Sequence, residues 1–307
     1  MNAVILGYGV VGKGIEILAK ALDDINIKYV YVRKEKENLP YFSNNEDMVV
    51  QDDIDIVFEC LNGLEPANTL IQKALKKGKH VISSNKAVVA TYLDTYLELE
   101  KEYGGSIQVE ACVAGGIPFI DALLKLKRLE PLQGYEGIFN GTSNYILDSM
   151  QKNNLDFEDV LKEAQDKGYA EKDPSNDIDG VDVYYKTKIS NSLAFNTPIV
   201  DIPYYAGIRT IKMLDIKFIK MNNKVIRHLS ISRQIDDKII SIIAPCCMDE
   251  NNFLANVPSN YNAQKILSHS FDTLGYYGQG AGQLPTAQAM VHNALDTLEN
   301  KERKIVY

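Results

Sequence analysis

An acidic and a basic residue stand four positions apart in the second half of the chain, at Asp182 and Lys186. On an α-helix this spacing places both side chains on one face, with the acid N-terminal to the base. Two further carboxylates, Glu171 and Asp177, lie on the loop that is predicted to lead into this helix. Such carboxylates could bind a small polar substrate that carries an ammonium group, and the lysine could protonate an alkoxide as it forms. By spacing alone, a salt bridge on a surface helix explains the pair more simply.

A glycine pattern at the start of the chain indicates a second kind of chemistry. It reads Gly7-Tyr8-Gly9-Val10-Val11-Gly12, and it ends a predicted strand and opens a predicted helix. That context distinguishes the dinucleotide fingerprint from an ordinary glycine turn. The first glycine allows the tight turn, the second lets the backbone approach a pyrophosphate, and the third allows close helix packing. The amides at the helix N-terminus would bind the phosphates.

The end of the second predicted strand, at residues 27–32, indicates which dinucleotide would bind. NAD sites usually carry Asp or Glu about 20 residues past the glycines, where it bonds to the ribose hydroxyls. Here Arg33 and Lys34 follow the strand, and no carboxylate appears before Glu35. The two cations could bind a 2′-phosphate, or they could form a solvated basic turn. We therefore expect NADP(H), with NAD(H) as the alternative.

Strands and helices alternate over about the first 110 residues. Apolar runs predict strands at residues 3–6, 27–32, 54–58, 81–82 and 107–109, with helices over 10–22, 66–77 and 88–103. This alternation predicts an α/β fold with a Rossmann-type, doubly wound parallel sheet.

The alternation stops after Pro118, and the pattern becomes that of an α+β domain. Helices are predicted over residues 120–129 and 142–152, the latter with Thr142 or Ser143 as its N-cap. Two more helical patterns lie between residues 157 and 196, split by a loop at 173–177. Strand-like runs at 137–141, 216–221, 225–231 and 239–244 suggest an antiparallel sheet. The segment from 275 to 300 is typical of a glycine-rich loop followed by an amphipathic helix.

Length and composition limit the class of protein. The 307 residues fit two domains, and 41 acidic against 33 basic residues argue against nucleic-acid binding. The first apolar run is far shorter than a membrane span. Four cysteines match neither a disulfide framework nor a zinc site, and the four histidines have no ligand-like spacing. We expect a cytoplasmic protein without nucleic-acid or membrane partners, whose thiols are buried or half-buried.

Several separated motifs together resemble the homoserine dehydrogenase family. They are the glycine pattern, Ser84-Asn85-Lys86-Ala87, residues 110–118, residues 140–147, residues 168–186, Gly280-Ala281-Gly282 and Pro285-Thr286-Ala287. Their order and combination are far more specific than the glycine pattern alone. The resemblance implies reversible NAD(P)H-dependent reduction of L-aspartate 4-semialdehyde to L-homoserine, a reaction of threonine and methionine biosynthesis.

The resemblance also implies roles for residues. Lys186 matches the general acid–base lysine, Lys86 the lysine that reaches cofactor and substrate, and Asp182 the partner that orients the substrate and Lys186. The positions that match substrate-binding residues are Glu171, Asp177, Asn140, Gly141 and Thr142. The positions that match cofactor-binding residues, besides the glycine pattern, Arg33 and Lys34, are Ser84, Lys86, Gly280 and Gly282.

A monovalent cation, sodium in the family, is implied at Glu110, Val113, Gly115 and Ile117. A carboxylate and backbone carbonyls of an irregular loop would supply its oxygen ligands, although the loop could simply join two domains. The resemblance further implies a homodimer and a discontinuous cofactor domain, residues 1–118 and 275–307, around a catalytic and dimerisation domain, residues 119–274. The chain stops about 20 residues beyond Thr286, so we do not expect a regulatory ACT domain.

Two rival functions remain open at this point. Aspartate-semialdehyde dehydrogenase, or another Rossmann oxidoreductase, would share the dinucleotide-binding first domain. Aspartate-semialdehyde dehydrogenase would also need a catalytic cysteine, for which Cys112 is the nearest candidate. A protein that binds NADP without catalysis is the least favoured alternative.

Overall fold

The chain forms two compact units in the computed structural model, which describes residues 1–32 and 42–299. The first unit comprises residues 1–124, 196–199 and the C-terminal segment from 281, and the second comprises 125–195 and 200–280. Where the sequence predicts boundaries after residues 118 and 274, the compact units divide after 124 and 280. The short return at 196–199 has no signal in the sequence.

The first unit is built on a six-stranded parallel sheet with the order β3-β2-β1-β4-β5-β6. Its strands are β1 (Asn2–Leu6), β2 (Asn26–Tyr31), β3 (Phe42–Ser43), β4 (Ile56–Glu59), β5 (His80–Ser83) and β6 (Ser106–Gln108). The predicted doubly wound parallel sheet is confirmed. The strand β3 was not predicted, because two residues are too few to show a hydrophobic pattern.

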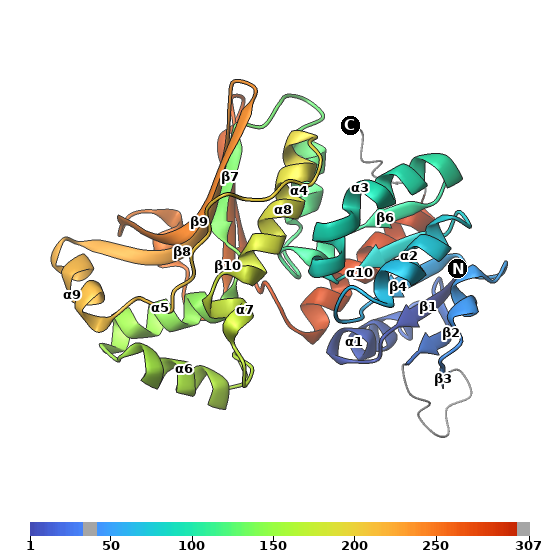
Figure 1. The fold of residues 1–307 in the computed structure, drawn as a ribbon, viewed down its shortest axis with the longest axis horizontal. Coiled ribbons are helices and arrows are strands. Elements are labelled where there is room, and N and C mark those ends of the chain that lie inside the picture. The colour runs from blue at the N-terminus through green and yellow to red at the C-terminus, as the bar shows by residue number, and fades with distance from the viewer. Residues whose placement is uncertain (33–41, 300–307) are drawn as a thin grey trace. The chain divides into compact units, whose positions relative to one another are not determined.

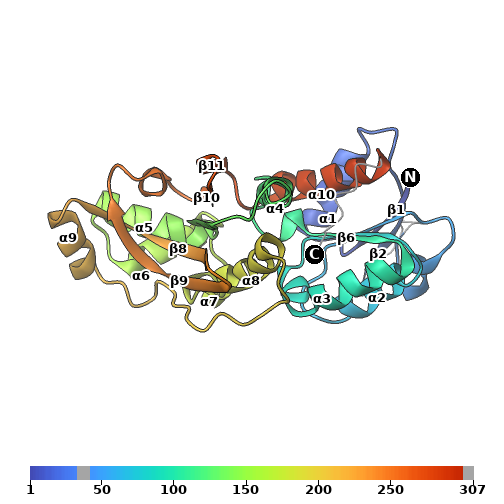
Figure 2. The same cartoon turned by 90° about the horizontal axis from the view of Figure 1, so that it is seen from above.

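Helices pack on this sheet, and one of them comes from the far end of the chain (Figure 2). They are α1 (Val10–Ala19), α2 (Ala67–Leu75), α3 (Lys86–Tyr103) and α10 (Gln283–Leu298). The unit also contains the short 3₁₀ turns η1 (Glu46–Val50) and η2 (Glu110–Cys112), and the division between the units after residue 124 falls within α4 (Phe119–Leu126). A Cβ added at Gly14 of α1 would lie 2.7 Å from the carbonyl oxygen of Gln283 and 2.9 Å from Ala287 Cβ. Glycine therefore lets α10 approach α1 closely, and Met290 joins the same core as Ile5.

The second unit is built on a five-stranded antiparallel sheet with the order β11-β10-β7-β8-β9 (Figure 1). Its strands are β7 (Gly134–Ile138), β8 (Lys224–Ile235), β9 (Lys238–Asp249), β10 (Asn262–Ser268) and β11 (Asp272–Gly278). Its helices are α5 (Gly141–Asn153), α6 (Phe157–Asp166), α7 (Ser175–Ile178), α8 (Val181–Phe195) and α9 (Met213–Met221), with η3 (Phe253–Asn256).

Two predictions for this unit were wrong. Residues 216–221 are not a strand but the end of α9, where Ile216 and Ile219, one helical turn apart, are the buried residues. Asp215 supports the helix start, because its carboxylate accepts a hydrogen bond from the amide of Lys212 at 2.8 Å. Gly275 does not begin a loop but lies inside β11, a largely exposed strand whose partner β10 supplies its hydrogen bonds.

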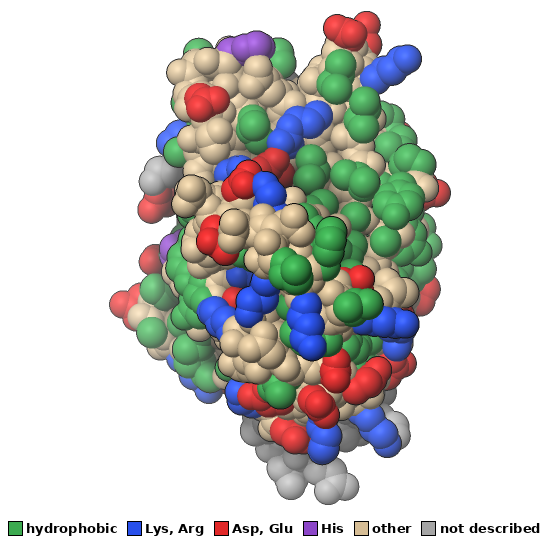
Figure 3. Space-filling model, turned by 90° about the vertical axis from the view of Figure 1, so that its left-hand side faces the viewer, with side chains coloured by type: hydrophobic (Ala, Val, Ile, Leu, Met, Phe, Trp, Pro, Cys, Tyr) green, Lys and Arg blue, Asp and Glu red, His purple; other side chains and the backbone are tan. Residues whose placement is uncertain are grey.

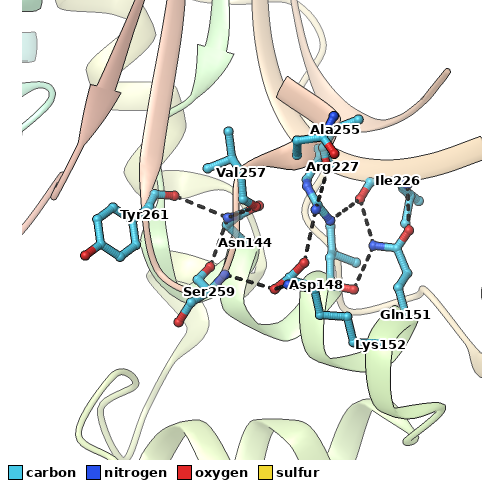
Figure 4. Close-up of polar contacts among 12 residues, drawn as sticks. Asn144, Asp148, Gln151, Lys152, Ile226, Arg227, Ala255, Val257, Ser259 and Tyr261 are labelled. Carbon is cyan, nitrogen blue, oxygen red and sulfur yellow. Dashed lines mark hydrogen bonds and ion pairs between the residues drawn. The ribbon is translucent and has the colours of Figure 1, made fainter. Parts of the chain in front are cut away.

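A buried polar network fixes α5 against β8 and the chain that follows η3 (Figure 4). Arg227 Nη2 lies 3.1 Å from Asp148 Oδ1 and donates to the carbonyl of Ala255 at 2.7 Å. The amide of Ser259 donates to Asp148 Oδ2 at 2.9 Å. Asn144, also on α5, donates to backbone carbonyls of the 257–261 segment. These bonds hold the helix whose N-terminus faces the polar site described next.

Candidate active site

Four polar side chains from three segments of the second unit meet at one place. Asn140 follows β7, Asp177 lies in α7, and Asp182 and Lys186 lie on α8. Asn140 Nδ2 donates to Asp177 Oδ1 at 2.6 Å and to Asp182 Oδ2 at 2.9 Å. Lys186 Nζ lies 2.8 Å from Asp182 Oδ2. The structure thus brings together one lysine, two carboxylates and one amide that the sequence analysis singled out.

The Asp182–Lys186 pair is buried, with side chains 5% and 10% exposed. The predicted shared helix face is confirmed, and the alternative of a surface salt bridge is wrong. Lys186 Nζ also donates to the carbonyl oxygen of Phe139 at 2.6 Å. The sequence analysis missed this backbone acceptor, which leaves no side-chain signal. An ammonium has three N–H donors, so Asp182 and Phe139 account for two of them.

Asn140 is held in place because it caps α5. Its Oδ1 accepts a hydrogen bond from the amide of Ser143 at 2.7 Å, and its backbone is extended, as expected of an N-cap. The prediction of Thr142 or Ser143 as the cap was therefore wrong. The helix begins at Gly141, where a Cβ would lie 2.5 Å from the carbonyl oxygen of Asn260. Close backbone packing thus explains the glycine.

The remaining predicted substrate positions have different surroundings. Thr142 Oγ1 donates to the carbonyl of Tyr169 at 2.6 Å, which ties α5 to the segment before α7. Asp177 was predicted on a loop, but it lies in α7, a single helical turn. Glu171 is exposed, and its backbone carbonyl accepts a hydrogen bond from Gln165.

Polar side chains also fill the contact between α8 and β8. Thr187 Oγ1 donates to Ser230 Oγ at 2.8 Å, so the polar composition of α8 is accommodated within the core. His228, only 1% exposed, donates through Nε2 to the carbonyl of Ala206 at 2.8 Å. Burial lowers the pKa of His228 to about 4, against the opposing effects of the Ala206 hydrogen bond and the charge of Asp182. The sequence analysis gave this histidine no role.

Replacing His228 by glutamine should make the protein less sensitive to acid. The pKa of His228 is depressed in the folded state, so its contribution to stability is complete above the unfolded pKa of about 6.5 and is lost as the pH falls toward 4. Relative to His228→Gln, the wild type should therefore lose about 2 kcal/mol of unfolding free energy between pH 7.5 and 5. Urea unfolding at both pH values measures this, and a pH-independent difference would contradict it.

The glycine pattern of the first unit follows β1 and opens α1, as predicted. A Cβ at Gly12 would collide with the carbonyl oxygen of Gly7, which itself has a φ of +95°. A Cβ at Gly9, in contrast, would meet no atom within 4 Å. Val10 and Val11 form the first turn of α1, and Val10 is exposed. The open space beside Gly9 fits the approach of a pyrophosphate to the backbone.

The other predicted cofactor positions lie at the ends of elements. Ser84 joins β5 to α3, and its amide donates to the carbonyl of Glu59 at 3.0 Å, while Lys86 is the first residue of α3. Gly282 has a φ of +128° and stands at the N-cap of α10. Gly280 belongs to the second unit. Arg33 and Lys34 lie outside the described residues.

The predicted cation loop includes η2. Glu110 is buried, and its carboxylate accepts hydrogen bonds from the amides of Ile120 at 3.1 Å and Asp121 at 2.6 Å, in the first turn of α4. Gly115 has a φ of +59°. The other predicted ligands, through backbone carbonyls, are Val113 and Ile117. A buried carboxylate in an irregular loop fits the oxygen ligands of a hard cation, and here it also caps a helix.

The described part of the chain was also compared with the requirements of a metal site, a membrane-spanning helix and a reactive thiol. It contains no group of three or more His, Cys, Asp or Glu able to hold a metal ion. Within the same residues, no helix has the length and apolarity needed to cross a bilayer. Cys112 is buried, and burial raises the pKa of its thiol, so a reactive thiolate is disfavoured. Cys247 is exposed, contrary to the expectation that all four thiols are buried or half-buried.

A Rossmann-type unit joined to a unit with a buried lysine–carboxylate pair defines the class of the protein: an oxidoreductase that uses a nicotinamide dinucleotide. A family model described as homoserine dehydrogenase matches residues 118–295, and one described as the homoserine dehydrogenase NAD-binding domain matches residues 7–110. The chain belongs to the homoserine dehydrogenase family.

Individual relatives agree with this assignment. The homoserine dehydrogenase of Neisseria gonorrhoeae is 38% identical over 81% of this chain and 58% of that protein. The Synechocystis homoserine dehydrogenase is 36% identical over 95% of this chain and 72% of that protein. The crystal structure of a Thiobacillus denitrificans homoserine dehydrogenase, 34% identical, superposes with a TM-score of 0.93 over 99% of this chain and 74% of that chain. The chain thus spans between about three fifths and three quarters of these relatives.

Proposed function

We propose that the chain catalyses the reversible NAD(P)H-dependent reduction of L-aspartate 4-semialdehyde to L-homoserine, with Lys186 as general acid and base. The observation that carries this proposal is the buried Asp182–Lys186 pair, joined by Asn140 and the Phe139 carbonyl. Burying two charges is costly even when they are paired. A pair held this tightly is therefore better explained by chemistry than by stability.

The proton transfer falls to Lys186. When bound, the nicotinamide supplies the hydride that reduces the aldehyde carbon. In this direction Lys186 Nζ gives its third proton to the carbonyl oxygen, which becomes the hydroxyl of homoserine. In the oxidation of homoserine, neutral Lys186 takes that proton from the hydroxyl as hydride leaves the carbon. Asp182 and the Phe139 carbonyl orient the amine and stabilise its charged form.

Substrate binding is assigned to the carboxylates and to the start of α5. Asp177 and Glu171 would bind the ammonium group of the amino acid, and Asn140 fixes Asp177 in position. Gly141 and Thr142 would pass close to the substrate, as the family resemblance implies. Lys86, in the first unit, would bind cofactor and substrate.

The cation and the oligomer are further parts of the proposal. Glu110, with the carbonyls of Val113, Gly115 and Ile117, would hold a sodium ion that stiffens the loop leading to α4. We also propose a cytoplasmic location and a homodimer, and the dimer is supported by apolar side chains that reach the surface of the second unit (Figure 3). On α9 these exposed residues are Leu214, Phe218 and Met221, and on the edge strand β9 they are Ile240 and Ile242.

Oxidation of L-homoserine with NAD and NADP, measured side by side, tests the activity and the cofactor preference together. We expect homoserine-dependent formation of reduced nicotinamide, with tighter binding of NADP than of NAD. The proposal would be overturned if reduced nicotinamide formed at the same rate without homoserine. It would also be overturned if the protein catalysed phosphate-dependent oxidation of aspartate semialdehyde in place of homoserine oxidation.

Replacing Arg33 by alanine should weaken the binding of NADPH at least tenfold more than the binding of NADH. A guanidinium binds a phosphate through paired, charge-assisted hydrogen bonds. NADH has no 2′-phosphate and makes no such bonds, so the substitution should affect its binding much less. Fluorescence titration of both cofactors with Arg33→Ala and with the wild type measures the difference. Equal losses for the two cofactors would refute a 2′-phosphate site at Arg33.

A further inference from the structure

Glu59 is a fully buried carboxylate of the first unit that the proposed mechanism does not use. It is the last residue of β4, is 0% exposed and pairs in register with Leu6, the last residue of β1. The glycine turn therefore begins beside it, and a Cβ at Gly7 would lie 2.8 Å from the carbonyl oxygen of Cys60. The strand order reverses between β1 and β4, which is where doubly wound folds bind their ligands.

The Glu59 carboxylate joins two loops at this edge of the sheet. Its Oε1 accepts a hydrogen bond from the amide of Leu61 at 2.8 Å, in the loop after β4. Its Oε2 accepts from Ser83 Oγ at 2.6 Å, at the end of β5. Ser83 Oγ in turn accepts from the amide of Asn85 at 3.1 Å. Asn85 Nδ2 returns to the first loop by donating to the carbonyl of Gly63 at 2.8 Å.

This chain of hydrogen bonds ends at the start of α3. Asn85 is the N-cap of the helix, and its Oδ1 accepts from the amide of Val88 at 3.3 Å. Asn85 lies between Ser84 and Lys86 in the sequence. The backbone that carries both predicted cofactor residues is therefore positioned by Glu59 through Ser83 and Asn85.

A charged carboxylate at Glu59 costs free energy because the side chain is buried, so a carboxylate at this position calls for a functional explanation. Burial raises the pKa of Glu59 to about 7, against the hydrogen bonds from Ser83 and Leu61 that lower it. Those donors are neutral, and burying a carboxylate among neutral groups costs more than burying an amide. Glutamine would fill the same space, but it keeps only one acceptor oxygen, so its NH₂ group would face either the Leu61 amide, which can only donate, or Ser83 Oγ, which already accepts from the amide of Asn85.

We propose that Glu59 is a positioning residue for the cofactor and substrate lysine, Lys86: by accepting from Leu61 and Ser83 it holds the turn 83–86 against the loop 60–63. The proposal rests on the proposed function, because Lys86 acts there on cofactor and substrate. The effect of Glu59 on the turn itself can be measured without any substrate.

The test compares Glu59→Gln with Glu100→Gln in the full chain. Glu100, a half-buried residue at the other end of α3, is the control, because its carboxylate also accepts a backbone hydrogen bond, from the amide of Ile107 in β6 at 2.9 Å. In Glu59→Gln we expect the amides of Leu61, Asn85 and Val88 to exchange with solvent at least tenfold faster. We also expect kcat for homoserine to fall at least thirtyfold, with a smaller change in KM. Glu100→Gln should leave kcat and these three amides unchanged.

Ser83→Ala and the double variant separate positioning from general destabilisation. If both single changes act through the Glu59–Ser83 hydrogen bond, the double variant should lose no more activity than Glu59→Gln alone. Ser83→Ala also keeps the test open should Glu59→Gln fail to fold, since it should reproduce the faster exchange at Asn85. The proposal would be overturned if Glu59→Gln kept the amide exchange rates and the kcat of the wild type. It would also be overturned if Glu100→Gln lost as much kcat and as much amide protection as Glu59→Gln. An inactive wild type whose exchange pattern still responds to Glu59→Gln would instead count against the proposed function alone.

Discussion

Alanine at position 186 should lower kcat for homoserine oxidation at least a thousandfold while NADPH still binds. General acid–base catalysis contributes about 10²- to 10⁴-fold, and loss of Lys186 removes both the proton carrier and the partner of Asp182. Because Asp182 would remain buried without a counter-charge, the free energy of unfolding should also fall by about 3 kcal/mol. Steady-state rates, NADPH titration and urea unfolding measure the three quantities.

Arginine at position 186 separates the charge from the chemistry. A guanidinium can pair with Asp182 but does not deprotonate in proteins, so Lys186→Arg should recover stability and remain inactive. Lys188→Ala is the matched control, because Lys188 lies on the same helix and pairs with the exposed Asp201 at 2.9 Å. Normal kcat in Lys186→Ala, or an active Lys186→Arg, would exclude Lys186 as the acid and base.

Where hydrophobic and glycine patterns were strong, the sequence predicted the fold well. Strands β1, β4 and β5 of the first unit are short, almost wholly buried runs of mainly apolar residues, and each is followed by a turn and a helical period. The four-residue spacing of Asp182 and Lys186 predicted their contact, because helix geometry alone decides it. Burial of the pair had no such signal, since it depends on α7, β8 and β9 packing against α8.

The misses in the second unit have physical causes. In α9 exposed apolar side chains stand between the buried ones, so the period is blurred, and β11 is too exposed to show alternation. Backbone acceptors such as the Phe139 carbonyl do not appear in any residue pattern. Glu59 was missed for a related reason: a lone acid at the end of an apolar strand becomes informative only when the loop of another strand meets it.

The second and third glycines of the cofactor turn, Gly9 and Gly12, should respond to alanine in opposite ways. At Gly9 a Cβ would meet no protein atom within 4 Å, so Gly9→Ala should change the free energy of unfolding by less than about 1 kcal/mol. The methyl group would occupy the space that a pyrophosphate needs, so NADPH affinity should fall at least a hundredfold. At Gly12 the Cβ would collide with the carbonyl oxygen of Gly7. Gly12→Ala should therefore cost about 3 kcal/mol or more of stability.

Thermal or urea unfolding without cofactor, together with NADPH titration, distinguishes the two positions. Gly104→Ala, at the C-cap of α3, is the control for glycine replacement itself: the φ of +80° at Gly104 predicts backbone strain, and a Cβ there would meet no atom within 4 Å. That variant should lose some stability and keep its NADPH affinity. If Gly9→Ala bound NADPH as tightly as the wild type, the pyrophosphate could not lie against this backbone. The dinucleotide would then have to bind elsewhere on the first unit, and the assignment of the glycine pattern would fail while the fold assignment remained.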